Sequence, residues 1–412
     1  MTSSRVVNFG CRLNAAEAAT IEALLAQAGD SDTLVVNTCA VTQEAERDAL
    51  AAIRRLKRER PEARIVVTGC AAQLDPARYG ALAEVDAVVG NRDKLDPDVW
   101  HARASAVSDI MVRQDFVAGD IGLAQGRTRA FIEIQQGCDH RCTFCVIPYA
   151  RGPSRSLAIE GACARVARAV AAGRREVVLT GVDLTAWGDD LPGRPRLGDL
   201  CAAILAGVPD LARLRLSSVD PAELDDGLFD LMAREQRFAP FLHLSVQAGD
   251  DLILKRMKRR HSRAQVLATV ARARAVRPDI AVAADLIAGF PTESEAAFEN
   301  TRALVDEIGL AHAHVFAYSP RPGTPAARMR PLPEATVRAR ARMLRAAAAG
   351  ARQRYLAARV GGMADVLVEK SGREGLDAQG ARVRLADPHP RGTLVRVRVT
   401  GHDPAGLFGV PA

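Results

Sequence analysis

The sequence has no apolar stretch long enough to cross a membrane. Its 412 residues are 48% hydrophobic and 25% charged, and no run approaches the roughly 18 apolar residues of a spanning helix. The N-terminus, MTSSRVVNFGC, has one arginine and only a few apolar residues, too few for a secretory signal peptide. We therefore expect a cytoplasmic protein with no membrane partner, whose thiols stay reduced.

The sequence also lacks a fourth cysteine where three stand close together. Cys138, Cys142 and Cys145 lie within eight residues in the stretch QQGCDHRCTFCVIPYARGPSRS. In a large chain with eight cysteines and reduced thiols, such a group is more typical of metal ligands than of disulfides. A closed zinc site needs a fourth ligand, for which His140 is a candidate, whereas a four-iron cluster on three thiolates keeps one iron open for a small molecule. Spacing alone leaves both possibilities open.

Three further cysteines each follow a short apolar run. VVNFG precedes Cys11, LVVNT precedes Cys39 and IVVTG precedes Cys70, and each run predicts a buried parallel strand. Helical patterns separate the runs, and in the first of them Asn14 and Glu17 are spaced as a capping box. Strands alternating with helices predict a doubly wound parallel sheet whose functional edge is the carboxyl end of its strands. This topology can bring the three thiols into one crevice.

The alternation resumes after a segment, about 93–127, that we interpret as a connector with a weak strand at AVSDIMV. Six strand and helix units predict an open (βα)6 partial barrel of the triosephosphate isomerase type. The close cysteine group follows the first strand and so lies on the face of the strand ends. Cys163 and Cys201 fall in helical patterns and are expected to be packing residues. The six strand candidates are RAFIEIQQG, EVVLTGVDL, LRLSSVD, FLHLSVQAG, IAVAADLIAGF and HAHVFAYS.

The C-terminal part is basic and changes its period. A long Ala/Arg helix is predicted over 331–359, followed by the alternating strands MADVLVEK, ARVRLAD and TLVRVRVTG, which predict a small antiparallel barrel. From residue 326 onward, 16 Lys and Arg stand against 7 Asp and Glu, although the whole chain carries only +7. Such a charge favours RNA as a partner, and solvated arginine-rich faces are the alternative. The expected domains are 1–110, 124–355 and 356–412.

The close cysteine loop, with Phe144 just before its last cysteine, resembles the signature of radical S-adenosylmethionine enzymes. The resemblance implies a 4Fe-4S cluster on Cys138, Cys142 and Cys145 whose open iron binds S-adenosylmethionine, with Phe144 near the adenine. It also implies reductive cleavage of that cofactor to methionine and a 5′-deoxyadenosyl radical.

Further motifs are similar, almost end to end, to the methylthiotransferases. That family joins an N-terminal three-cysteine domain, a radical barrel and a C-terminal TRAM domain. The resemblance implies a second 4Fe-4S cluster, on Cys11, Cys39 and Cys70, which binds the sulfur to be delivered. No side chain beyond the cluster ligands is implied as catalytic. The motifs that carry the resemblance are GCRLN, VVNTCAVT, VVTGCAAQ, LSVQAGDD and AYSPRPGTPAA.

Weaker matches concern the cofactor contacts. Gly181 and Asp183 in LTGVDL occupy the place where the superfamily shows Gly-Gly-Glu, and GFPTESE has Thr292 where the family form GFPGET has glycine. KRMKRRH at 255–261 either grips RNA phosphates or ends a solvated helix. The residues expected to bind S-adenosylmethionine are Phe144, Gly181, Asp183, Ser217, Ser245 and Gln247.

The stretches VIPYARGPSRS and LTGVDLTAWGDDL look most like the branch of the family that acts on threonylcarbamoyl-adenosine. We therefore expect methylthiolation at carbon 2 of that nucleoside at position 37 of tRNA, with the anticodon loop as partner and flavodoxin or a similar protein as electron donor. Methylthiolation of isopentenyl-adenosine, or of a ribosomal-protein aspartate, is the alternative within the family. A zinc-containing RNA-binding protein is the alternative outside it.

Overall fold

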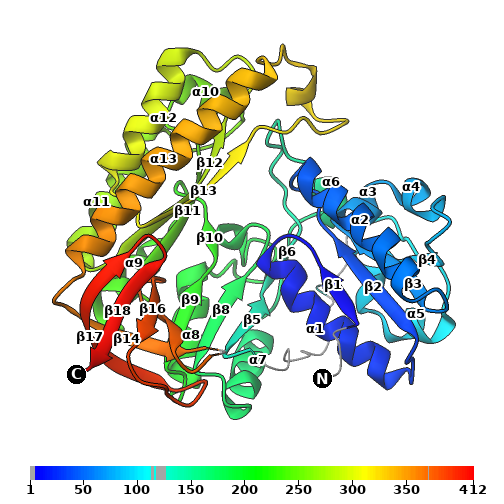
Figure 1. Ribbon diagram of the computed structural model, residues 1–412, viewed down its shortest axis with the longest axis horizontal. Coiled ribbons are helices and arrows are strands. Elements are labelled where there is room, and N and C mark those ends of the chain that lie inside the picture. The colour runs from blue at the N-terminus through cyan, green and yellow to red at the C-terminus, as the bar shows by residue number, and fades with distance from the viewer. Residues whose placement is uncertain (1–4, 113–115, 117–126, 370) are drawn as a thin grey trace.

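The computed structural model describes residues 5–112, 116, 127–369 and 371–412. An N-terminal parallel sheet and a small C-terminal barrel lie on opposite flanks of a central partial barrel (Figure 1). No helix within the described residues is long and apolar enough to cross a membrane.

The N-terminal sheet is parallel, with its strands in chain order and helices on both faces. Val35 and Val66 point to one face, where α1 and α5 cover them, and Val36 and Val67 point to the other, where α2 to α4 pack. The expected doubly wound sheet is therefore confirmed. Its elements are β1 (Val6–Asn8), α1 (Arg12–Gln27), β2 (Thr33–Thr38), α2 (Gln43–Glu59), β3 (Arg64–Gly69), α3 (Cys70–Leu74), α4 (Pro76–Gly80), β4 (Ala87–Val88), η1 (Asp93–Leu95) and α5 (Pro97–Ala102).

The central region is an open barrel of parallel strands with helices outside. One sheet has the order β5-β8-β9 and the other β10-β11-β12-β13, and only Ser217 separates β9 from β10. All six expected strands are present, so the partial barrel is confirmed. The strands are β5 (Arg129–Glu133), β8 (Glu176–Thr180), β9 (Arg213–Leu216), β10 (Ser218–Val219), β11 (Phe241–Gln247), β12 (Ala281–Ala288) and β13 (His312–Ala317).

Amphipathic helices pack their apolar faces onto these strands and build one large core. Cys201 is fully buried in it and Cys163 packs against its edge, as expected. The main helices are α7 (Ile159–Ala171), α8 (Leu197–Gly207), α9 (Asp226–Arg234), α11 (Arg263–Val276), α12 (Glu295–Glu307) and α13 (Glu334–Ala358). Shorter elements are β6 (Gln135–Gln136), α6 (Ile147–Arg151), β7 (Arg155–Ser156), η2 (Leu184–Ala186), α10 (Asp251–Arg256) and η3 (Pro325–Arg328).

The C-terminal strands close into a barrel in the order β14-β15-β16-β18-β17. Val397 and Val399 are buried while Arg396 and Arg398 are exposed, which is the alternation the sequence predicted. Two strands were not expected, because glycine interrupts the short β15, and β18 contains two glycines and a proline. The strands are β14 (Met363–Val368), β15 (Glu374–Asp377), β16 (Arg382–Leu385), β17 (Leu394–Asp403) and β18 (Gly406–Pro411).

This C-terminal barrel covers the amino ends of the core strands. Arg213, the first residue of β9, donates a hydrogen bond of 2.9 Å to the carbonyl of Asp365, and Arg129, the first residue of β5, pairs with Glu369 at 3.1 Å. The buried carboxylate of Glu176 holds Arg213 at 2.9 Å in the same layer. The small barrel is therefore fixed at the edge opposite to the one from which the cysteine loop emerges.

Two local expectations are wrong. The helix α1 begins at Arg12, so Asn14 and Glu17 lie inside it and form no capping box. The stretch AVSDIMV contributes one bridge residue, Ala106, instead of a strand. The first part of the expected connector, with η1 and α5, packs on the N-terminal sheet through the buried Trp100, while its residues 113–115 and 117–126, including the expected boundary at 124, lie outside the described residues.

Candidate active site

The first three cysteines lie at the carboxyl edge of three neighbouring strands. Cys11 precedes α1, Cys39 directly follows β2, and Cys70 directly follows β3 as the first residue of α3. Cys39 and Cys70 are buried, whereas Cys11 is exposed. Residues far apart in the sequence thus meet at one edge of the sheet because its strands are parallel and adjacent.

Glycine is required before two of these cysteines. Gly10 and Gly69 have φ values of 95° and 97°, a region that side chains with a Cβ rarely adopt. A Cβ on Gly69 would lie 2.3 Å from the carbonyl oxygen of Thr38, and one on Gly10 would lie 2.5 Å from the sulfur of Cys39. The backbone therefore passes close to the neighbouring strand end, which leaves room for the sulfur atoms.

Burial raises the pKa of four of the six thiols, namely Cys11, Cys39, Cys138 and Cys145. Burial, and secondarily the neighbouring Cys70 thiol, raises the pKa of Cys39 to about 12, and burial raises the pKa of Cys145 to about 12. A soft metal centre deprotonates such thiols because its positive charge stabilises the thiolates. Thiols in groups of three are therefore suited to iron-sulfur or zinc binding.

A buried ion cluster, made of Glu17, Lys94 and Arg151, adjoins the first cysteine set. Arg151 donates to both carboxylate oxygens of Glu17 at 2.6 and 2.9 Å, and Lys94 donates to Glu17 at 2.7 Å. The Nε of Arg151 lies 3.3 Å from the sulfur of Cys70. Burial lowers the pKa of Arg151, but the Cys70 thiol and Glu17 beside it outweigh that effect and raise it well above the ordinary value.

The second cysteine set occupies the loop that follows β5 and β6. The amide of Cys138 donates to the carbonyl of Gly152 at 3.1 Å. Thr143, between the last two cysteines, donates its amide to Met257 at 3.1 Å and its hydroxyl to Arg256 at 2.7 Å. The loop is therefore fixed at both ends by backbone contacts, and its sulfur atoms need no distant side chain to orient them.

Polar groups surround this second set. Asp183 lies 3.6 Å from the sulfur of Cys138 and 2.8 Å from His140, and its hydrogen bond raises the pKa of His140 to about 10. His140, the candidate fourth zinc ligand, thus faces a carboxylate. Arg259 lies 3.7 Å from the sulfur of Cys142 and pairs with Asp220 at 2.8 Å.

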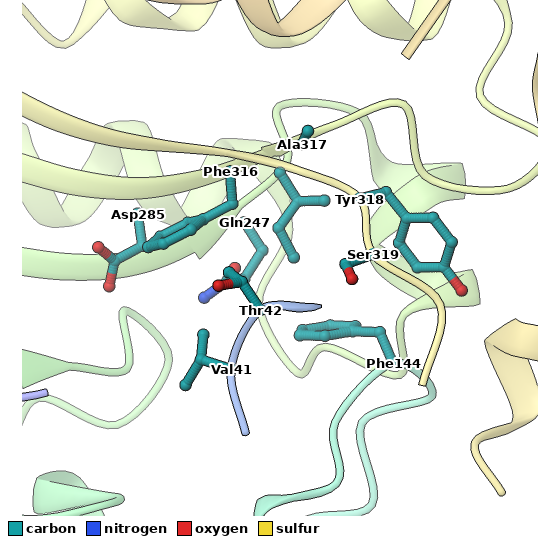
Figure 2. Close-up of a pocket in the computed structure, with 10 residues that line it drawn as sticks. Val41, Thr42, Phe144, Gln247, Asp285, Phe316, Ala317, Tyr318 and Ser319 are labelled. Atoms are coloured by element: carbon teal, nitrogen blue, oxygen red, sulfur yellow. The ribbon is translucent and has the colours of Figure 1, made fainter. Parts of the chain in front are cut away.

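One cavity of about 210 Å³ is lined by chain neighbours of one cysteine from each set, although no cysteine among the described residues lines it. Val41 and Thr42, just after Cys39, line it from the N-terminal sheet, and Phe144, just before Cys145, lines it from the core loop. Figure 2 shows the segment with Val41 and Thr42 entering between Asp285 on one side and Phe144 on the other. The remaining lining residues are Gln247, Asp285, Ile287, Phe316, Ala317, Tyr318 and Ser319.

Two of the six residues expected to bind the cofactor line this cavity, namely Phe144 and Gln247. Phe144 packs edge-on against Phe290 at 6.5 Å, and Gln247 has the unusual φ of 72° at the end of β11. Gly181, Asp183, Ser217 and Ser245 are not among the lining residues.

Three of these residues differ in whether their polar groups already have hydrogen-bond partners within the protein. The hydroxyl of Ser217 is buried without a hydrogen-bond partner among the described residues, and a ligand can satisfy it. A Cβ on Gly181 would lie 2.9 Å from the carbonyl of Gln135, whose side chain accepts the amide of Asp183 at 2.8 Å. The Gly181 loop is therefore held by Gln135.

The basic segment 255–261 is largely engaged within the protein. Arg256 donates to the hydroxyl of Thr292 at 2.7 Å, Arg259 pairs with Asp220, and Arg260 pairs with Glu223. Thr292, in the place of the family's glycine, has a φ of 69°, so this turn keeps the glycine conformation.

A polar cluster on the inner face of the barrel was not expected from the sequence. Asp285 accepts hydrogen bonds from His243 at 3.0 Å and from His314 at 2.9 Å, and the three side chains come from adjacent strands. Burial raises the pKa of Asp285, but the two histidines outweigh that effect and keep it well below the ordinary value. The signal was available, because polar residues interrupt the otherwise apolar runs FLHLSVQ, AVAADLIA and HAHVFA.

A parallel partial barrel with three cysteines on a loop after its first strand defines the class of radical S-adenosylmethionine enzymes. Residues 132–305 match the model of the Radical SAM superfamily, and residues 4–90 match that of the Uncharacterized protein family UPF0004. A solved structure of the methyltransferase TsrM from Kitasatospora setae shares the fold with a TM-score of 0.51 and 16% identity, covering 74% of this chain and 68% of its own.

Two relatives in sequence are tRNA methylthiotransferases. The chain is 46% identical to the threonylcarbamoyladenosine tRNA methylthiotransferase MtaB of Rickettsia prowazekii, over 89% of this chain and 87% of that protein. It is 38% identical to the tRNA-2-methylthio-N(6)-dimethylallyladenosine synthase of Novosphingobium aromaticivorans, over 90% of this chain and 87% of that protein. The chain belongs to the radical S-adenosylmethionine methylthiotransferase family and is therefore an enzyme, so the alternative of a non-catalytic zinc protein is wrong.

Proposed function

We propose that this enzyme adds a methylthio group to carbon 2 of N6-threonylcarbamoyladenosine at position 37 of tRNA. The relative from Rickettsia prowazekii, whose name states activity on this nucleoside, is more similar to this chain than the dimethylallyladenosine synthase is, at 46% against 38% identity. The alternatives are methylthiotransferases that act on isopentenyl-type adenosine or on a ribosomal-protein aspartate.

The structural observation that carries the methylthio transfer is the cavity lined by chain neighbours of both cysteine sets. Its lining residue Thr42 is three positions after Cys39, and Phe144 is the neighbour of Cys145. A methylthio transfer needs one substrate atom to meet both a radical source and a sulfur source. A cavity lined by chain neighbours of both sets supports that chemistry, which a single cluster does not supply.

We propose 4Fe-4S clusters at both sets, held by Cys11, Cys39 and Cys70 and by Cys138, Cys142 and Cys145. When bound, the clusters supply the electron that cleaves S-adenosylmethionine and the sulfur that is delivered. The residues fit such groups, since three thiols form each set and thiolates are the usual ligands of iron-sulfur clusters. At the first set, Arg151 and Lys94 leave one positive charge in excess over Glu17, and this charge offsets part of the negative charge of three thiolates.

The remaining residues of the site position the cofactor and exclude water. Phe144 offers an aromatic face for the adenine, and Gln247 and the buried hydroxyl of Ser217 offer hydrogen bonds at strand ends. Ser245 and the backbone of Gly181 and Asp183 border the same strand edge. These residues bind and orient, and no side chain in this proposal acts as a general base.

The partners follow from the substrate. The anticodon loop of tRNA presents position 37 as an unpaired base, which enters the cavity splayed from its neighbours. A flavodoxin or similar protein supplies electrons, and the reaction takes place in the cytoplasm. We keep 1–110, 124–355 and 356–412 as the limits of the iron-sulfur, radical and TRAM-like domains.

The decisive experiment is nucleoside analysis of tRNA from a strain that lacks this protein, with the wild-type gene and a Cys142→Ala gene restored in parallel. We expect methylthio-threonylcarbamoyladenosine to disappear, to return with the wild-type gene, and to stay absent with the variant. If that nucleoside persists and a methylthio-isopentenyl-type adenosine disappears instead, the substrate is the alternative one.

A further inference from the structure

Arg151 belongs to the radical core by sequence but is buried beside the other cysteine set. It lies six residues after Cys145, at the end of α6, and its side chain is only 1% exposed. We propose that Arg151 is a positioning residue for the N-terminal iron-sulfur cluster. Its guanidinium fixes the sulfur of Cys70 and raises the reduction potential of the cluster. This inference rests on the proposed function, because it requires a cluster on Cys11, Cys39 and Cys70.

The first support is a pair of hydrogen-bond donors aimed at one sulfur. The Nε of Arg151 lies 3.3 Å from the Cys70 sulfur, and the Nδ2 of Asn91 lies 3.6 Å from it. Hydrogen bonds to a ligand sulfur withdraw electron density and are one of the factors that set the potential of iron-sulfur clusters. Two donors on one sulfur favour the reduced cluster.

The second support is the way the guanidinium is held. Its two terminal nitrogens donate to Glu17, and one of them also donates to the side-chain oxygen of Asn14 at 2.6 Å. Only Nε then remains for the sulfur, and it points there. A planar fork of donors makes these contacts together, which a lysine ammonium in the same place does not.

The third support is the charge and burial of the surroundings. Lys94 is fully buried and Glu17 is 2% exposed, so no solvent screens the field that reaches Cys70. A buried excess of positive charge favours the state of a cluster that carries the extra electron. The other cysteine set has charges of both signs nearby, since the carboxylate of Asp183 lies 3.6 Å from Cys138 and Arg259 lies 3.7 Å from Cys142.

The position of Arg151 in the chain also joins the two sets mechanically. Its neighbour Gly152 accepts the amide of Cys138 at 3.1 Å, while the carbonyl of Ala150 accepts from Asn91 at 2.8 Å. One short segment therefore contacts a cysteine of the core loop and the surroundings of Cys70.

The test uses the full chain with Cys138, Cys142 and Cys145 replaced by alanine, so that the N-terminal set alone binds iron. After anaerobic reconstitution, iron and sulfide are measured, and the midpoint potential is determined by a titration followed by electron paramagnetic resonance. Into this background we introduce Arg151→Lys and, separately, Asn91→Ser. Arg155→Lys is the matched control, because Arg155 is also buried in the same segment but donates to Gln136 and to the Arg151 carbonyl.

We expect Arg151→Lys to shift the midpoint to a lower potential, Asn91→Ser to shift it less in the same direction, and Arg155→Lys to leave it unchanged. A merely structural role of Arg151 alters iron content without moving the potential of the clusters that do form. If Arg151→Lys takes up no iron, the shift in Asn91→Ser decides, and equal potentials in all loaded variants overturn the inference. If the alanine background itself binds no iron, the proposed cluster on Cys11, Cys39 and Cys70 is wrong. Iron analysis thus tests the proposed function, and the midpoint potentials test the role of Arg151.

Discussion

The two cysteine sets are assembled by opposite routes. Cys138, Cys142 and Cys145 lie within eight residues, and backbone hydrogen bonds fix their loop. Cys11, Cys39 and Cys70 are spread over sixty residues and meet only because three parallel strands end side by side. A local set needs one well-held loop, whereas a long-range set needs the whole sheet to fold first.

The two sets also differ in what surrounds them. Beside Cys70 lies the buried cluster of Glu17, Lys94 and Arg151, whose members come from distant parts of the chain. Beside Cys138 and Cys142 lie Asp183 and Arg259, at the ends of core elements. Both sets therefore depend on tertiary structure for their electrostatics, but only the long-range set depends on it for its geometry as well.

The largest effect is expected from removing one sulfur of each set. Cys142→Ala should abolish cleavage of S-adenosylmethionine and therefore all product. Cys70→Ala should abolish the methylthio product but keep the cleavage, since the core loop does not depend on Cys70. Chromatography of 5′-deoxyadenosine and of tRNA nucleosides measures both. Equal loss of cleavage in both variants would contradict the separation of roles.

A second substitution tests how strictly the sheet edge is built. Gly69→Ala places a Cβ 2.3 Å from the Thr38 carbonyl at a φ of 97°, and the strain with the overlap costs roughly 3 to 5 kcal/mol. Iron at the N-terminal set should fall while iron at the core loop remains.

The matched control is Gly173→Ala, which has a similar φ of 81° but, within the described part of the chain, no neighbour within 4 Å. It should cost only about 1 kcal/mol, because the left-handed backbone alone is penalised. Urea unfolding of the metal-free protein gives both free energies of unfolding, and similar losses for the two variants would show that the close approach at Gly69 is unimportant.

The local set was predictable from the sequence and the long-range environment was not. Apolar runs in the sequence predict the strands, and the cysteines come soon after these runs. Both sets could therefore be placed at strand ends from the sequence alone. Asn14 and Glu17 look like a capping box but are buried partners of Arg151, and Glu17 lies 134 positions from it. The His243, Asp285 and His314 cluster likewise needs three strands in register. Contacts of this kind depend on packing, which one-dimensional patterns do not contain.

The stability of the protein should depend on pH through Glu133, which is connected to both cysteine sets. Glu133 is the last residue of β5, shortly before the core loop, and its carboxylate interacts with the ion cluster of Glu17, Lys94 and Arg151 and with Arg155. Burial, and then Glu17, raises the pKa of Glu133 to about 7. A raised folded-state pKa stabilises the protein fully below the ordinary carboxyl pKa of about 4.5, and this contribution is lost as the pH rises through about 7.

The side chain in Glu133→Gln stays neutral at every pH. The free energy of unfolding of this variant, relative to that of the wild type, should therefore rise by roughly 2 to 3 kcal/mol between about pH 4.5 and 8 in the metal-free protein. Urea unfolding at a series of pH values measures the difference. The variant Glu160→Gln, on the first turn of α7, is the control and should show no such trend. A constant difference between Glu133→Gln and the wild type would place the carboxylate in an ordinary environment.

The smallest effect on stability is expected from substitutions on the surface of the C-terminal barrel. This surface, which we expect to bind RNA, lies apart from both cysteine sets. The barrel is fixed at the amino ends of the core strands, whereas both sets lie at carboxyl ends, so bound tRNA must reach around the core. Replacing the exposed Arg396 and Arg398 by glutamine should change the free energy of unfolding by less than about 0.5 kcal/mol. Iron at both sets should stay unchanged.

The same double variant should weaken tRNA binding and lower the slope of log affinity against log salt by about 2, one for each phosphate that an arginine no longer neutralises. Filter binding of unmodified tRNA over a range of salt concentrations measures this slope. Arg338→Gln with Arg342→Gln, on the exposed side of α13, removes equal charge elsewhere and should leave it nearly unchanged. Equal slopes in both double variants would mean that the total charge, rather than the surface of the barrel, attracts the RNA. Bound tRNA would then not need to reach from the barrel, at the amino ends of the core strands, around the core to the cavity.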